Sequence, residues 1–186
     1  MRTVKLQFQT SADGYISGPG GEMDWMTMPW SADMEDHVGG LWKDVDTIVL
    51  GRKLAETFIP AWESRPEGET DETVDQMVNT PKVVFSRTLK ESPWDNATIA
   101  AGSLAETMAG LKAAEGGDIM VSGGGTLAQQ LIAEGLIDEI HLFANPVSLG
   151  GGLPVFPTGA RHEFTLARSH AFECGVAGLT YLPRKS

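Results

Sequence analysis

The sequence has one cysteine, few basic residues and no long uninterrupted hydrophobic run. With Cys174 alone, an intramolecular disulfide and a zinc site built from several thiolates are both excluded. The longest stretch without Asp, Glu, Lys or Arg, residues 140–160, is interrupted by glycines and prolines and cannot span a membrane. The first ten residues alternate in polarity and lack the apolar run of a signal peptide, so we expect a soluble cytoplasmic protein.

The shortage of basic residues also limits the partners. The 186 residues include 14 Lys and Arg against 25 Asp and Glu, which gives a formal net charge of −11. Nucleic-acid binding requires many phosphates to be neutralised, and no dense basic run is present. The same charge disfavours an anionic membrane surface. A small anionic ligand is still compatible with this charge, because two or three well-placed cations are enough to hold it.

The length and the pattern of apolar residues predict one α/β domain over residues 1–186. Strands are expected at 4–10, 47–50, 82–86, 98–100, 118–122 and 137–144, with helices between them and a terminal hairpin at 164–172 and 176–182. Gly39-Gly40 should bend the first helix or end it early. The polar stretch 60–70, with two prolines, should be an irregular excursion. The order of elements predicts a mostly parallel sheet with antiparallel edges.

The strongest local signal is a glycine-rich turn between a strand and a helix. Residues 118–126 run from an apolar strand through Gly123, Gly124 and Gly125 to a helix start. Free N–H groups at a helix start attract phosphate, and glycine lets the phosphate approach closely. Thr126 is positioned to cap the helix and to donate its hydroxyl. No Lys-Ser/Thr pair follows, so this is not a P-loop, and a tight turn without a ligand explains the motif equally well.

Two arginines follow other predicted strands. Arg52 comes after the strand at 47–50, and Arg87 comes after the strand at 82–86. Ligands of open α/β sheets bind beyond the carboxyl ends of the strands, where the glycine-rich turn also lies. The planar guanidinium suits phosphate oxygens, so the three features together fit two separated phosphate groups, as in NADPH. The alternative is that each arginine pairs with a surface carboxylate.

Several motifs in one order resemble the dihydrofolate reductase-like fold, and more closely the RibD C-terminal family, the reductase domain of the bifunctional riboflavin-biosynthesis enzyme. They are SADG at 11–14, GRK at 51–53, NTPK at 79–82, FSRTL at 85–89, VSGGG at 121–125 and the segment 135–156 with its GLIDE sequence. The match extends from Lys5 to Tyr181. The resemblance implies a three-layer sandwich with a C-terminal antiparallel hairpin.

The resemblance also implies NADPH as the hydride donor and indicates which residues hold it. The residues around the adenosine 2′-phosphate would be Gly51, Arg52, Lys53, Ser86 and Arg87, and those at the pyrophosphate Gly123, Gly124, Gly125 and Thr126. One position departs from the pattern: Leu54 stands where dihydrofolate reductases usually have a threonine whose hydroxyl helps to hold phosphate.

The substrate side has fewer signals. Dihydrofolate reductases hold the substrate ring with one carboxylate on the first helix, and both Glu35 and Asp36 lie at the matching place. Acidic residues are favoured at a helix start in any case, so the helix dipole alone explains both. Asp13 is the rival catalytic candidate, and an ordinary Asp-Gly turn is its alternative explanation. Trp25 belongs either to the substrate pocket or to the core.

The sequence therefore predicts an NADPH-dependent reductase that transfers hydride to a pterin-like or ribosylamino-pyrimidine-like substrate, as 5-amino-6-(5-phosphoribosylamino)uracil reductases do. A true dihydrofolate reductase is the alternative within enzymes, and a non-catalytic nucleotide-binding module is the alternative outside them. The resemblance to the riboflavin group also implies a homodimer. The four histidines have no metal-ligand spacing, so no metal site is expected.

Overall fold

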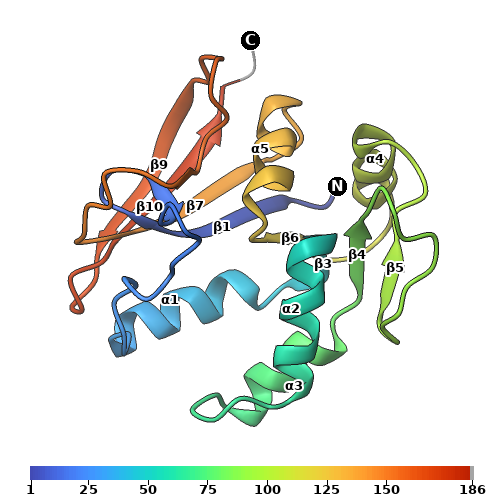
Figure 1. The fold of residues 1–186 in the computed structure, drawn as a ribbon, viewed down its shortest axis with the longest axis horizontal. Coiled ribbons are helices and arrows are strands. Elements are labelled where there is room, and N and C mark those ends of the chain that lie inside the picture. Colours follow the sequence, from blue (N-terminus) through green and yellow to red (C-terminus); the bar gives the residue numbers. More distant parts are fainter. Residues whose placement is uncertain (185–186) are drawn as a thin grey trace.

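An eight-stranded sheet runs through the molecule in the order β5-β4-β3-β6-β1-β7-β10-β9 (Figure 1). The computed structural model describes residues 1–184. The first six strands of this order are parallel, and β10 and β9 are antiparallel. The strands are β1 (Val4–Ser11), β3 (Val45–Gly51), β4 (Lys82–Phe85), β5 (Ala97–Ile99), β6 (Asp118–Ser122), β7 (Glu139–Asn145), β9 (Phe164–Ala171) and β10 (Ala177–Pro183).

Helices cover both faces of the sheet and make three layers (Figure 1). On one face lie α4 (Leu104–Ala113) and α5 (Gly125–Ala133), and on the other lie α1 (Ala32–Trp42), α2 (Arg52–Glu63) and α3 (Asp71–Asn79). The start of α4 is a capping box between Ser103 and Glu106, which have the serine-to-glutamate spacing of three residues that this motif requires. The predicted fold class, a mostly parallel α/β sheet with a terminal antiparallel hairpin, is confirmed.

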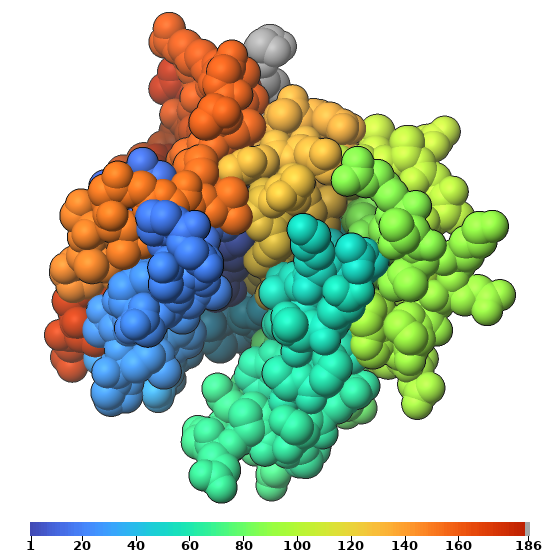
Figure 2. Space-filling view, in the orientation of Figure 1, coloured from blue at the N-terminus to red at the C-terminus, as the bar shows by residue number. Residues whose placement is uncertain are grey.

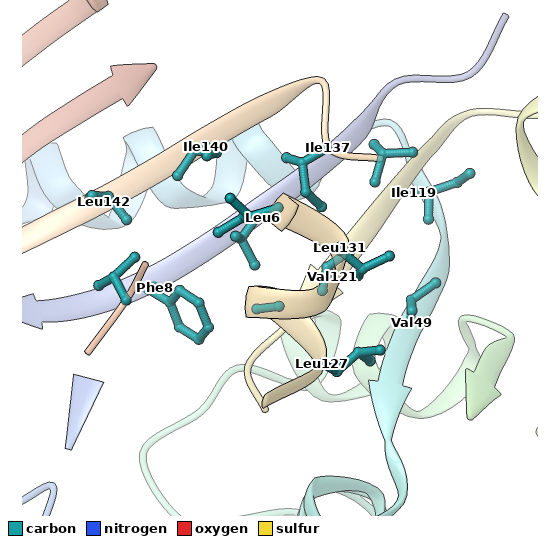
Figure 3. Packing of buried hydrophobic residues seen from close by; sticks show 14 of the residues in the cluster. Leu6, Phe8, Val49, Ile119, Val121, Leu127, Leu131, Ile137, Ile140 and Leu142 are labelled. Carbon is teal, nitrogen blue, oxygen red and sulfur yellow. The ribbon is translucent and has the colours of Figure 1, made fainter. Parts of the chain in front are cut away.

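Each face of the sheet has its own hydrophobic core, because alternate residues of a strand point to opposite faces. Under α5, the side chains of Leu6, Val121, Ile140 and Leu131 pack together and are fully buried (Figure 3). On the opposite face, Ile48, Leu50, Val84 and Met120 of the sheet pack against Trp42, Ala55, Ile59 and Met77 of the helices. The short apolar runs are therefore strands buried on both sides, typical of a parallel sheet.

Two helices are longer than the sequence predicts. Gly39 and Gly40 lie inside α1, which continues to Trp42 because that side chain is buried against the second core and donates from Nε1 to Gln7 Oε1 at 2.9 Å. Likewise α2 includes Pro60, so the excursion expected from residue 60 begins only after Glu63. Packing of one helix face outweighs the local cost of these residues.

A second, two-stranded sheet is absent from the sequence-based prediction. It pairs β2 (Tyr15–Ser17) with β8 (Leu153–Pro154), which are far apart in sequence. Gly152 passes so close to the Ser17 carbonyl that a Cβ there would lie 2.0 Å from the oxygen. Strands of two or three residues carry no periodicity, so only the tertiary structure reveals this pairing. None of the helices described in residues 1–184 has the length and the apolar character required to cross a membrane.

Leu131 tests the core beneath α5. Its side chain is fully buried, so Leu131→Ala should lower the free energy of unfolding by about 3 kcal/mol. The same change at Leu166, which is 51% exposed on β9, should lower it by less than about 0.5 kcal/mol. Urea unfolding followed by circular dichroism measures both, and equal losses would contradict this description of the core.

Candidate functional site

The predicted site residues meet at one edge of the sheet because the strands that precede them are parallel neighbours. Gly51 at the end of β3 pairs with Phe85 at the end of β4, and Gln7 of β1 pairs with Ser122 at the end of β6. Arg52, Arg87 and the glycine-rich turn therefore follow adjacent strands in the order β4-β3-β6, and Asp13 follows β1. The edge brings together residues that are up to 112 positions apart in the sequence, from Asp13 to Gly125.

The glycine-rich turn forms the N-terminus of α5. Gly123 and Gly124 have φ angles of 65° and 75°, a region that favours glycine, and Gly124 is the N-cap residue. The prediction that Thr126 caps the helix is therefore wrong: Thr126 lies exposed inside the first turn. Ala128 N–H donates to the Gly124 carbonyl at 3.1 Å and is the first N–H group in the helical hydrogen-bond pattern. The N–H groups of the helix residues before Ala128 therefore have no carbonyl acceptor within the helix. Such groups form an anion-binding position.

Apolar side chains lie close against this turn. A Cβ at Gly123 would lie 2.8 Å from Leu54 Cδ2, and a Cβ at Gly125 would lie 2.5 Å from Leu153 Cδ2. At Gly124 the nearest atoms would be 3.9 Å away. Gly123 and Gly125 must therefore lack a side chain, because a Cβ at either position would collide with a neighbouring leucine. Leu54, the residue that departs from the reductase pattern, covers one end of the turn.

The two arginines differ in what they contact. Arg52 Nη1 lies 2.5 Å from Glu56 Oε1 one helical turn later, so this arginine pairs with a carboxylate as its alternative explanation requires. Arg87 is exposed, and no carboxylate oxygen of residues 1–184 lies within 4.0 Å of its guanidinium. Ser86 Oγ accepts from the N–H groups of Thr88 and Leu89 at 3.1 and 2.8 Å and holds the turn that presents Arg87. Lys53 is exposed beside Arg52.

Asp13 anchors one loop of the site to another. Its carboxylate accepts from Ser148 Oγ at 2.8 Å and from the N–H groups of Leu149 and Gly150 at 3.1 and 2.8 Å. The Ser11 side chain, followed by these N–H groups, holds the pKa of Asp13 far below its usual range. The carboxylate is therefore ionised at neutral pH and holds the loop after β7 against the end of β1.

The acidic residues of α1 have different environments. Glu35 and Asp36 are exposed, and within residues 1–184 no hydrogen bond or ion pair engages their carboxylates. Asp33 instead accepts from Ser31 Oγ at 2.5 Å and from Glu173 N–H at 3.2 Å, and the Ser31 contact lowers its pKa. Asp33 thus ties the helix start to the β9–β10 hairpin, whereas Glu35 and Asp36 are available for other contacts.

Trp25 lies on a glycine-rich loop beside an open cavity. Its Nε1 donates to the Glu22 carbonyl at 2.9 Å. The neighbouring cavity, about 610 Å³, is lined by Ser17, the glycine-rich residues 18–21, Gly152 and Leu153. Leu153 also packs against Gly125 of the turn, so the cavity adjoins the start of α5. A second cavity, of about 550 Å³, is bordered by Ile137, Phe164 and Arg184 and contains none of the predicted site residues.

Asn145 is a residue of this edge that sequence reasoning missed. It ends β7, is 1% exposed, and donates from Nδ2 to Gln9 Oε1 at 3.0 Å. Its Oδ1 accepts from Thr27 N–H at 2.8 Å, so it ties the loop before α1 to the sheet. The only sequence signal is a polar residue at the end of an apolar strand, which a surface turn explains equally well.

The fold is dihydrofolate reductase-like, and the chain belongs to the RibD C-terminal domain family, which matches residues 2–177. The uncharacterized protein YyaP of Bacillus subtilis is 31% identical over 183 residues, with 97% of this chain and 94% of YyaP covered. Because this relative is described as uncharacterized, it assigns no substrate.

Two solved structures support the same fold. A protein of Shewanella sp. PV-4, provisionally assigned to riboflavin biosynthesis, has a TM-score of 0.78 and 25% identity, with 98% of this chain and 99% of that chain covered. The dihydrofolate reductase of Enterococcus faecalis, solved with NADP(H), has a TM-score of 0.61 and 17% identity, with 98% of this chain and 97% of that chain covered. At that identity the second likeness concerns the fold alone.

Asp13 makes the stability of the protein depend on pH. Its pKa in the folded state lies below the ordinary value of 3.8, so its stabilising effect is complete well above pH 3.8 and is lost as the pH falls through the folded pKa. Asp13→Asn should therefore destabilise the protein at pH 7, and the difference from wild type should shrink at pH 3. Urea unfolding at both pH values measures it. Asp95→Asn, an exposed aspartate elsewhere, is the control and should show no such trend.

Proposed function

We propose that this protein is an NADPH-dependent reductase that acts on a pterin-like or ribosylamino-pyrimidine-like ring. The family and the fold support a reductase. The observation that carries the cofactor assignment is the set of cations and free N–H groups at three adjacent strand ends, with Arg87 unpaired among residues 1–184. NADPH supplies hydride when bound, and the protein supplies position and surroundings.

Each element of the edge has a role in this proposal. The N–H groups at the start of α5 hold the pyrophosphate, because glycine leaves them accessible and the helix dipole favours negative charge. Arg87 and Arg52 hold the 2′-phosphate, with Arg52 exchanging Glu56 for a phosphate oxygen. Gly51, Lys53 and Ser86 complete that end. The space between α2 and the N-terminal segment, a hollow in the surface in Figure 2, accommodates the remainder of the cofactor.

The acidic residues divide into positioning and reacting roles. Asp13 positions the loop after β7, and its low pKa makes it a poor proton donor. Glu35 and Asp36 keep free carboxylates on α1, and in this proposal one of them contacts the substrate ring. Trp25 donates to the carbonyl of Glu22, next to the glycine-rich residues that line the cavity, and in this proposal it forms part of the substrate pocket.

Tryptophan fluorescence and NADPH absorbance test the proposal in two stages. NADPH should quench the fluorescence of the five tryptophans, and an absence of quenching in the wild-type protein would contradict the proposed reductase function. The protein should then consume NADPH with one of the two ring types. Consumption with dihydrofolate alone would identify a true dihydrofolate reductase. Tight NADPH binding without turnover of any substrate would instead favour a nucleotide-binding module.

Arg87 should determine the preference for NADPH over NADH. Arg87→Ala removes a charge-assisted contact to the 2′-phosphate and should raise the Kd for NADPH about tenfold while leaving the Kd for NADH unchanged. Fluorescence titration measures both constants. Arg65→Ala is the matched control, because Arg65 pairs with Asp71 and Asp75 away from this edge. An equal loss for the two cofactors would show that Arg87 does not contact the 2′-phosphate.

Leu54 should limit the affinity for the cofactor. Leu54→Thr uncovers the glycine-rich turn and adds a hydroxyl donor, and it should lower the Kd for NADPH about fivefold, the size of one neutral hydrogen bond. Leu54→Val has nearly the same shape as the threonine variant but no hydroxyl, so it separates space from hydrogen bonding. A weaker affinity in the threonine variant than in the valine variant would contradict this role.

A further inference from the structure

Lys and Arg are absent from the two chain segments that form the β1–β7 part of the edge, where the substrate would bind. Residues 6–42 contain no Lys or Arg, and they include the acids Asp13, Glu22, Asp24, Asp33, Glu35 and Asp36. Residues 139–160, which follow on the neighbouring strand, also contain no Lys or Arg. From this distribution of charge, and on the basis of the proposed reductase function, we infer that the substrate is an uncharged ring compound without a phosphate group.

These two segments form one end of the site. Residues 6–42 comprise most of β1, the loop that contains β2, and α1, and residues 139–160 comprise β7 and β8. Figure 1 shows the loop between β1 and α1 away from α2 and α3, and Thr27 of this loop donates its N–H to Asn145 of β7. The proposed cofactor phosphates lie at β4, β3 and β6, so the reactive end of the cofactor continues along the edge to β1 and β7. The substrate therefore meets the segments that lack cations.

The other end of the same edge has the cations that the β1–β7 end lacks. Arg52, Lys53, Arg87 and Lys90 follow β3 and β4, and only Arg52 has a carboxylate partner among residues 1–184. The cations that hold phosphate are thus reserved for the cofactor. A phosphate group on the substrate would lie at the β1 end among carboxylates, and its burial there without a cation would be unfavourable.

Glu22 places a carboxylate directly beside the cavity. Its Oε2 accepts from Gly20 N–H at 2.9 Å, and a Cβ at Gly18 or Gly20 would lie within 2.5 Å of its carboxylate oxygens. These glycines line the cavity of about 610 Å³. The backbone N–H group there that is suited to an anion is therefore already occupied by an acidic side chain, which repels a phosphate from the same position.

Neutral hydrogen-bond donors are present instead. Gln9 Nε2 and Trp30 Nε1 are buried without an acceptor among residues 1–184. Asn145 holds the Gln9 amide oxygen, and Gln9 pairs in register with Phe143, whose cluster includes Trp30. Both N–H groups therefore belong to the segments without cations, and such neutral donors suit the carbonyl oxygen of a pterin or pyrimidine ring, which needs no charged partner.

Paired compounds that differ only by a phosphate test the inference. The protein is titrated with 5-amino-6-ribosylaminouracil and its 5′-phosphate, and with 7,8-dihydroneopterin and its monophosphate, both with and without NADP⁺. Tryptophan fluorescence gives the Kd, and NADPH absorbance gives kcat/KM. In at least one pair the unphosphorylated compound should bind about tenfold more tightly than its phosphate. Equal or tighter binding of the phosphates, or no binding of any compound, would overturn the inference.

The two proposals fail in different ways. If NADP⁺ does not bind but an uncharged ring does, the reductase proposal fails and the inference about charge stands. If NADPH binds and the phosphorylated compounds are preferred, the reductase proposal stands and the inference fails.

Reversing the charge at Glu22 tests whether the carboxylate beside the cavity is what disfavours the phosphorylated compounds. Glu22→Lys should tighten binding of the phosphorylated compounds about tenfold and leave the unphosphorylated ones within about twofold. Glu67→Lys makes the same change of charge on the exposed loop between α2 and α3 and serves as the control. Equal effects of the two variants would show that net charge, and not the charge beside the cavity, governs selection.

Discussion

Parallel pairing of β5, β4, β3, β6, β1 and β7 is the constraint on which the site depends. A parallel pair needs a crossover from one end of the sheet to the other, so all the carboxyl ends of these strands lie at one edge. Arg52, Arg87, the glycine-rich turn and Asp13 each follow such an end, and for this reason alone they share a neighbourhood. The buried cores on both faces maintain the strand register, and the register maintains the site.

Lys and Arg residues are unevenly distributed along this edge. Cations and free helix N–H groups occupy the β4-β3-β6 half, and carboxylates with neutral donors occupy the β1-β7 half. The net charge of −11 is therefore not spread evenly over the molecule. Membership of the RibD C-terminal domain family supports a reductase, whereas the choice of a particular substrate does not follow from the family and is inferred from the charge of the loops around Glu22 and Gly152.

The parts of the fold with strong local signals could be predicted from sequence. The capping box at Ser103, the alternation in β1 and the apolar runs of β3, β4 and β6 fix their elements with little help from elsewhere. Predictions based on helix-breaking residues were wrong at Gly39-Gly40 and Pro60, because burial of Trp42 and Ile59 outweighs local propensity. The pairing of β2 with β8 joins segments too short to have a period, so no local pattern could indicate it.

In the candidate site, too, some features follow from the sequence and others only from the tertiary structure. The sequence by itself determined the types of group available: glycines at a helix start, two arginines after strands, and a segment without cations. Only the tertiary structure decided which of them are free, because pairing depends on side chains brought together from distant positions. The pairing of Arg52 with Glu56 is the exception, because it is local and lies within α2, whereas the fold leaves Arg87 exposed and joins Asp13 to Leu149 and Gly150 across the sheet. Hydrogen bonds between residues more than a hundred positions apart follow from the register of the sheet, which the order of amino acids does not display.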